Sequence, residues 1–230
     1  MDLEEFSFWF PKGSFHAVAE GPSVLLTGDG FHACDTPDQA RGLAAQLLDE
    51  FGATISLLWP SYRAPSLGTV HERMPDGTRH GTAIGMVGMA VGRSKARATS
   101  TVPPGTDPGP TQAQALWAAA KSAPRLEVAL LLWADPARTW PRLYRILEEL
   151  EAHLEQTLSS AGLCSANERA RFTRSANTAE VAGNESRHAG GKFQPPAKPM
   201  SLREASGFVR TMLTKVLQAR STSQRSGNAA

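Results

Sequence analysis

The chain has 230 residues, of which 41% are hydrophobic and 20% are charged, and its formal net charge is +2. This composition allows one large or two small globular domains, and it excludes a wholly disordered or uniformly basic chain. The charge is unevenly spread: residues 1–100 hold 8 Lys and Arg against 11 Asp and Glu, net −3, whereas residues 165–230 hold 11 against 4, net +7. This basic last quarter either attracts phosphates or is simply a solvated helix face and tail.

The compartment is predicted from the cysteines, the N-terminus and the apolar runs. Two isolated cysteines, Cys34 and Cys164, are typical of reduced thiols rather than of a disulfide framework. The first residues, MDLEEFSFWF, are acidic where a secretory signal is basic. The longest apolar run, residues 83–91, is far shorter than the roughly 20 residues that span a bilayer. We therefore expect a cytoplasmic protein with no membrane segment.

Short strands are predicted near the N-terminus. Aromatic residues alternate over residues 6–10, which indicates a strand. Runs at 24–27 and 31–34 flank Gly28-Asp29-Gly30, which predicts a hairpin because glycine readily adopts positive φ.

The first helix has clear start signals. Thr36 can act as the N-cap, Pro37 occupies the first helical position, and Gln39 completes a capping box. We expect this helix to cover one face of the sheet and to end at Gly52, followed by a strand over residues 53–59.

A second hairpin is predicted from two strand-like runs, residues 67–74 and 79–91, on either side of Asp76-Gly77. A two-residue loop at Asp76-Gly77 would place Arg73 opposite His80, with His71 diagonal to His80 on the same face. Imidazole and guanidinium groups together suit an oxyanion site or acid–base chemistry, although polar outer faces of hairpins are also common.

Residues 100–111 are rich in Pro, Gly, Ser and Thr, which predicts a connector between two domains. We expect four regions: an α+β domain at 1–99, the connector at 100–111, a helical domain at 112–219 and a disordered tail at 220–230. The fold class is therefore α+β, with a small antiparallel β-sheet and one covering helix followed by an all-α helical bundle.

Helices are expected in the second half from their apolar spacing. Capping boxes at Ser165/Glu168 and Ser201/Glu204 mark two of the starts, and Gly162 is the expected end of the longest helix. Four glutamates of that longest helix are expected on its solvent face: Glu148, Glu149, Glu151 and Glu155. The expected ranges are 112–122, 125–134, 140–161, 166–177, 178–188 and a last helix from 201 to about 220.

Common catalytic and metal-binding signatures are missing. The chain has no phosphate-binding P-loop, no nucleophile elbow and no zinc-protease motif. His32 and Cys34 lie two residues apart but have no second pair to complete a metal site. We expect no metal and no cofactor.

The segment RARFTRSANTAEVAGNESRH, residues 169–188, holds the main site candidates. Its cationic and amide side chains could bind a ligand or form a structural network or an interface. An imidazole beside a guanidinium can act on a phosphodiester, which makes Arg187 and His188 the catalytic candidates. The binding candidates are Arg169, Arg171, Arg174, Asn177 and Asn184.

Four segments together resemble a set of uncharacterised bacterial proteins: WPRLYRILE from Trp140, RFTRSAN from Arg171, NESRH from Asn184 and PPAKPM from Pro195. Their helical part is similar to the HEPN class of helical domains over about residues 112–218. That resemblance implies a relation to the RNases of defence and toxin–antitoxin systems.

The sequence departs from the HEPN ribonuclease motif, in which a His follows an Arg by four to six residues. Arg187 and His188 are adjacent, and Arg145 precedes His153 by eight positions. The usual catalytic pair therefore cannot be carried over to this chain.

Two functions remain open from the sequence. The first is a non-catalytic interaction or dimerisation protein of a bacterial defence or stress system, with a protein partner or a second copy. Trp117, Trp133 and Trp140 would then be interface anchors, unless they are core residues. The alternative is a nucleic-acid-binding protein or atypical RNase that binds RNA through the basic C-terminal helices, with strong salt dependence.

Overall fold

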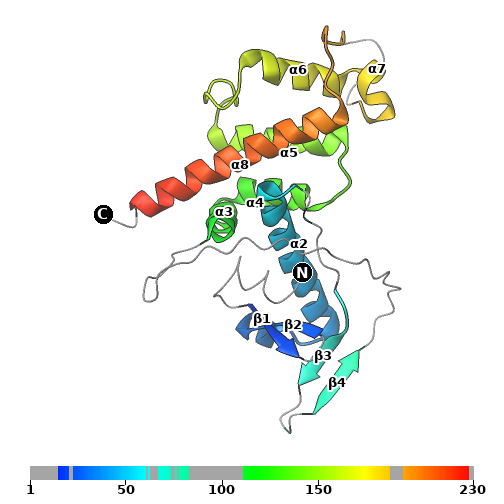
Figure 1. The fold of residues 1–230 in the computed structure, drawn as a ribbon, viewed down its shortest axis with the longest axis vertical. Helices are drawn as coiled ribbons and strands as arrows, with labels where there is room; N and C mark the ends of the chain where they lie inside the picture. The colour runs from blue at the N-terminus through cyan, green and yellow to red at the C-terminus, as the bar shows by residue number, and fades with distance from the viewer. Residues whose placement is uncertain are drawn as a thin grey trace. The chain divides into compact units, whose positions relative to one another are not determined.

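The computed structural model has an α+β fold in which antiparallel strands near the N-terminus are followed by a helical bundle, as predicted (Figure 1). The chain divides into a first unit, from residues 1–47 and 65–111, and a second unit, from residues 48–64 and 112–230. The structure describes residues 15–20, 23–60, 62, 67–73, 76, 78–82, 111–186 and 194–227. The predicted strand at 6–10 and most of the predicted connector lie outside these residues.

The first unit contains the hairpin of β1 (His16–Glu20) and β2 (Ser23–Thr27), in which Val18 pairs with Leu25. The predicted hairpin around Gly28-Asp29-Gly30 is wrong, because β2 pairs with the segment before it. After β2 the chain forms a 3₁₀ turn, η1 (Asp29–Ala33). The Phe31 ring of this turn packs edge-on against Phe15 at a centroid distance of 5.2 Å, so Phe31 is used in packing rather than in strand pairing.

The second hairpin consists of β3 (Val70–Arg73) and β4 (Arg79–Thr82). Arg73 pairs with Arg79, so the loop runs from residue 74 to residue 78 and the predicted two-residue loop is wrong. Asp76 explains the longer loop, since its carboxylate accepts hydrogen bonds from the Thr78 backbone N–H at 2.8 Å and the Thr78 hydroxyl at 2.6 Å. These local bonds compete with strand pairing at Thr78.

Helix α2 (Pro37–Leu58) begins as predicted. The Gln39 N–H donates to Thr36 Oγ1 at 3.2 Å, while Gln39 Oε1 accepts from the Asp35 N–H at 2.7 Å. The returning bond of the box therefore goes to the residue before the cap. Both bonds satisfy groups that a helix start otherwise leaves unpaired.

The helix continues through Gly52, so the predicted strand over residues 53–59 is wrong. Glycine costs a helix only about 1 kcal/mol relative to alanine, and burial of the surrounding residues outweighs that cost. Ala53 and Leu57, four residues apart, are both buried in the core of the second unit. Ile55 is also fully buried. Apolar residues at every second position, here 53, 55 and 57, are the pattern typical of a strand.

The second unit is a helical bundle whose predicted elements are mostly confirmed. The main difference is α5, which ends at Leu154 instead of near Gly162 because Glu155 adopts a left-handed conformation (φ 54°). The last helix also continues beyond Arg220, to Gly227. The elements are α3 (Gln112–Lys121), α4 (Pro124–Ala134), α5 (Trp140–Leu154), α6 (Ala166–Asn177), α7 (Ala179–Ala182), η2 (Gly183–Glu185) and α8 (Leu202–Gly227).

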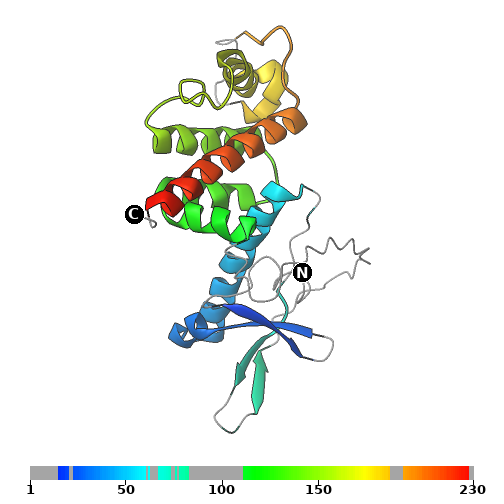
Figure 2. The ribbon, with the colours of Figure 1, turned by 60° about the vertical axis from the view of Figure 1, so that its left-hand side comes forward.

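The helices of this unit are arranged in layers. Figures 1 and 2 show α5 and α8 side by side, with α6 and α7 on one side of them and α3 and α4 on the other. Leucine, isoleucine and phenylalanine side chains from α3, α4, α5, α6 and α8 form one continuous core. Among the described helices, none is both long enough and apolar enough to span a membrane.

Of the three tryptophans considered as interface anchors, Trp133 and Trp140 belong to this core and Trp117 packs against it. Trp133 and Trp140 are each only 4% exposed, and Trp117 is partly buried against the core. The indole N–H of Trp133 donates to Ser56 Oγ, and that of Trp117 donates to a Glu50 carboxylate oxygen, each at 2.9 Å. The core interpretation is therefore correct, and exposed anchors must be sought elsewhere.

Candidate functional site

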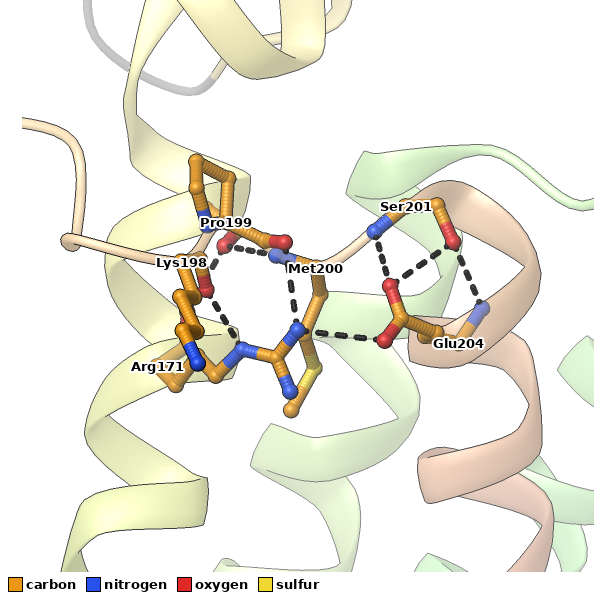
Figure 3. Close-up of polar contacts among 7 residues, drawn as sticks. Arg171, Lys198, Pro199, Met200, Ser201 and Glu204 are labelled. Atoms are coloured by element: carbon orange, nitrogen blue, oxygen red, sulfur yellow. Dashed lines mark hydrogen bonds and ion pairs between the residues drawn. The ribbon is translucent and has the colours of Figure 1, made fainter.

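Arg171 links three segments of the helical unit (Figure 3). From α6, its Nε donates to the Lys198 carbonyl at 2.5 Å, and its Nη2 donates to the Pro199 carbonyl at 3.2 Å. The same nitrogen forms an ion pair with Glu204 at 3.1 Å. Arg171 thus ties α6 to the loop before α8 and to the first turn of α8, and these donors are not available to a ligand without breaking the links.

Glu204 also completes the predicted capping box of α8. One carboxylate oxygen accepts from the Ser201 N–H at 2.8 Å and the Ser201 hydroxyl at 2.9 Å, while the Glu204 N–H donates to Ser201 Oγ at 3.2 Å (Figure 3). Hydrogen bonds from Ser201, together with the hydrogen bond and charge of Arg171, lower the pKa of Glu204 to about 2. The carboxylate is therefore held in its charged form at the helix start.

Arg169 forms a two-pronged ion pair with Glu151 of α5. Its Nε and Nη2 donate to the two carboxylate oxygens, each at 2.6 Å, in the geometry that makes arginine–carboxylate pairs strong. One of these oxygens also accepts from the Leu158 N–H at 2.9 Å. The hydrogen bonds to Glu151 raise the pKa of Arg169. Arg169 therefore fastens α6 to the end of α5.

The remaining binding candidates are not brought together into one site. Arg174 and Asn184 are exposed, whereas Asn177 is only 7% exposed. Asn177 Oδ1 and Thr173 Oγ1, four residues apart on α6, are shielded from solvent and have no hydrogen-bond partner within the described part of the chain. An ordered water is the usual solution for two such neighbouring buried groups. The catalytic candidates Arg187 and His188 lie outside the described residues.

The register predicted to bring His71, Arg73 and His80 to one face of the hairpin is wrong. His71 pairs with Gly81 and Arg73 pairs with Arg79, whereas His80 pairs with Glu72. Directly paired residues of antiparallel strands share a face, and successive residues alternate between faces. His80 therefore lies on the opposite face of the hairpin from His71 and Arg73, because the five-residue loop shifted the register by one position.

Glu149 was expected on the solvent face of α5, but it is only 2% exposed. Its carboxylate pairs with Arg125 of α4 at 3.0 Å and with Arg145, one turn earlier on α5, at 2.6 Å. The Arg145–Glu149 spacing is a sequence signal for a helical ion pair, but the contribution of α4 depends on tertiary packing.

The outer face of α4, defined here as Pro124, Val128 and Leu131, holds two of the three exposed large apolar side chains described in this unit, the third being Trp59 at 47% exposure. The helix contains two charged residues, Arg125 and Glu127, among its 11 residues. Its inner face is fully used in the core, yet Val128 is 40% exposed and Leu131 is 38% exposed. A helix with so few charged residues is normally buried over most of its surface. The outer face of α4 is therefore the candidate interaction surface, and sequence analysis missed it.

The described residues contain no group of three or more His, Cys, Asp or Glu side chains placed to hold a metal ion. Comparison with known proteins identifies no relative: no family model matches the chain. Neither a curated protein nor a solved structure matches it.

Proposed function

We propose that this chain is a non-catalytic protein-interaction module that binds its partner through the outer face of α4. The observation that carries the proposal is the exposure of Val128 and Leu131 on a helix with only two charged residues among 11. Fully burying one such side chain contributes about 1.5–3 kcal/mol, so covering this face gives a favourable contribution to binding. The role in a bacterial defence or stress system is proposed from the sequence resemblance alone.

The basic segment supports this choice over the nucleic-acid alternative. Arg169 and Arg171, two of the 11 cations of residues 165–230, are engaged with Glu151 and Glu204. Binding phosphate there would require these ion pairs to break. Arg174 is the exposed cation of α6, and Lys198, Arg203 and Lys215 are also exposed in this basic segment.

The test compares Leu131→Asp with Val18→Asp, a substitution at an equally exposed residue of β1. We expect Leu131→Asp to abolish partner binding, because a carboxylate would be desolvated at the centre of the contact, and Val18→Asp to leave it unchanged. Association of the tagged chain would be measured by sedimentation and by quantitative affinity capture. Equal partner recovery with both variants would contradict the proposal.

The nucleic-acid alternative has its own measurement. Labelled single-stranded RNA would be titrated with the wild-type chain and with Arg174→Ala at two salt concentrations. Binding that weakens steeply with salt and is reduced by Arg174→Ala would favour the alternative. Absence of binding at low salt would exclude it.

A further inference from the structure

We propose that α8 carries a second binding surface, which takes the phosphodiester backbone of a nucleic acid across Arg203, Gly207 and Arg210. We call these three residues the α8 cradle. The inference goes beyond the proposed function and does not depend on it, because neither the outer face of α4 nor the arginines of α6 take part. The group that is recognised is the phosphate, so binding should be independent of the base sequence.

The α8 cradle lies on one face of its helix. Steps of four and three residues return a helix to the same side, so Arg203, Gly207 and Arg210 line up along about 10 Å of the axis. The core side of α8 is a different one, on which Ala205 and Val209 are at most 1% exposed. Arg203 is exposed and Arg210 is partly exposed. Both guanidinium groups therefore project from the side that the bundle core does not use.

The arginines of the cradle have no acid to pair with, in contrast to many cations of the preceding helices. Six cations of α3, α4, α5 and α6 pair with carboxylates, namely Lys121, Arg125, Arg142, Arg145, Arg169 and Arg171. Among the side chains that the structure describes, neither Arg203 nor Arg210 has an ion-pair or hydrogen-bond partner. Glu204 is turned to α6, where it pairs with Arg171 (Figure 3). Residues 205–230 contain no Asp or Glu, so the positive potential of the cradle is not offset by its own helix.

Gly207 leaves the space between the two arginines open. A Cβ atom at this position would meet no heavy atom within 4 Å, so packing does not require a glycine there. Its φ is not positive, so the backbone conformation does not require a glycine either. Glycine is a weaker helix former than alanine, which makes this position costly without a compensating use. The missing side chain gives a phosphate room to approach the helix between Arg203 and Arg210.

The chemistry of this face favours a polyanion over a protein partner. Interfaces between proteins depend on large apolar or aromatic anchors, and the described face around Gly207 offers none. Phosphate groups are instead bound by arginine and lysine side chains, and arginine does so in a planar, two-pronged geometry. Two guanidinium groups about 10 Å apart suit a chain of phosphates better than a single one. Lys198, exposed in the loop before α8, adds a further cation.

The experiment is a fluorescence anisotropy titration of labelled single-stranded RNA with the full chain at low and moderate salt. We expect Arg203→Ala and Arg210→Ala each to weaken binding by about 10-fold, the usual effect of losing a charge-assisted contact. Each should also reduce the dependence of the logarithm of the binding constant on the logarithm of salt by about one. Two unrelated base sequences should bind equally, and a strong preference for one would overturn the phosphate as the recognised group.

Lys215→Ala is the matched control, because it removes one charge from another side of the same helix. Lys215 donates to the Leu163 carbonyl at 2.7 Å. Hydrogen bonds from Ser165, together with the charge of Lys215, lower the pKa of Glu168, so Lys215 lies near an acid of α6. We expect Lys215→Ala to weaken binding by less than about 2-fold at moderate salt, where distant charges are screened. An equal effect from all three substitutions would assign binding to net charge and overturn the cradle.

Gly207→Leu tests the open space without changing the charge. The leucine would fill the gap between the guanidinium groups and should lower the affinity for RNA at least about 5-fold, whereas the control Ala219→Leu should not change it. Ala219 is exposed on the same helix, a third of a turn around from Gly207. Thermal unfolding should show that Gly207→Leu is at least as stable as the wild type, because leucine is the better helix former. Unchanged RNA affinity in Gly207→Leu would overturn the cradle.

The result can be separated from that of the proposed function. A chain that captures a protein in a Leu131-dependent manner but binds no RNA at low salt overturns the cradle and leaves the proposed function standing. RNA binding that is lost with the cradle substitutions supports the cradle, whatever Leu131→Asp does to protein capture. RNA binding that falls in Arg174→Ala but persists in both cradle arginine variants would place the site on α6 and overturn the cradle.

Discussion

Helices α4 and α6 belong to the same unit but differ in which of their side chains make contacts within it. Helix α6 carries four charged residues, Glu168, Arg169, Arg171 and Arg174, and has a complete capping box. Helix α4 carries two charged residues and no side-chain cap. Yet two arginines of α6 are engaged in links to neighbouring segments, whereas two large apolar residues of α4 remain exposed.

The difference shows that charge in a sequence does not by itself mark a binding surface. The arginines of α6 reach acids or carbonyls from α5, α8 and the loop before α8, so their charge is used inside the unit. Val128 and Leu131 remain substantially exposed on the outside of α4. Under the proposed function, exposed apolar side chains, rather than an excess of charge, mark the interaction surface of these helices.

The largest expected effect is the difference in stability between substitutions on the inner and the outer face of α4. Leu130 is 1% exposed and Leu131 is 38% exposed. Leu130→Ala should lower the free energy of unfolding by about 3 kcal/mol, because it removes buried contacts and leaves a cavity, whereas Leu131→Ala should lower it by less than about 1 kcal/mol. Urea unfolding at low protein concentration would measure both. Equal losses would mean that Leu131 is a core residue, and the outer-face argument would fail.

A smaller difference in stability is expected between substitutions at two arginines of α6. Arg169→Ala should destabilise the chain by about 2 kcal/mol, because it removes two charge-assisted hydrogen bonds to Glu151. Arg174→Ala, at an exposed position, should change the free energy of unfolding by less than about 0.5 kcal/mol. Thermal and urea unfolding of the two variants would be compared. A neutral Arg169→Ala would show that the ion pair makes no net contribution to stability.

Local signals were the most predictable part of this fold. The capping boxes at Ser165 and Ser201 form with both hydrogen bonds, and the start of α2 at Thr36 forms the first of its two, while Gln39 accepts from Asp35 instead. Each of these involves residues within four positions of one another, so their geometry is fixed largely by the local chain. The helix of residues 166–177 was therefore predicted with its observed bounds.

Features that depend on tertiary contacts could not be predicted. Residues 53–58 alternate like a strand but continue α2, because Ala53 and Leu57 pack into the core of the helical unit. Glu149 is buried, and part of its charge is compensated by Arg125 from another helix. The outer face of α4 was missed for the same reason: the spacing of apolar residues cannot tell which side of an apolar helix the other helices cover.

The smallest expected effect compares the two capping glutamates, Glu204 and Glu168. Both have lowered pKa values because of their Ser201 and Ser165 hydrogen bonds, but Glu204 also interacts with Arg171, and its pKa falls to about 2. A carboxyl with a lowered folded-state pKa stabilises the fold above its ordinary pKa near 4.5, and this contribution is lost as the pH falls toward the folded-state value. The stability from Glu204 should thus decline from about pH 4.5 to about pH 2.

Thermal unfolding would be followed from neutral to acidic pH for the wild type, Glu204→Gln and Glu168→Gln. Because glutamine does not titrate, each variant should lose its part of the acid sensitivity. The loss should be larger for Glu204→Gln, since that carboxylate links α8 to α6 as well as capping its own helix. Equal pH profiles for the two variants would mean that Arg171 adds nothing to the cap. In that case Arg171 would be energetically free to leave Glu204 for a phosphate, and the contrast between α4 and α6 would weaken.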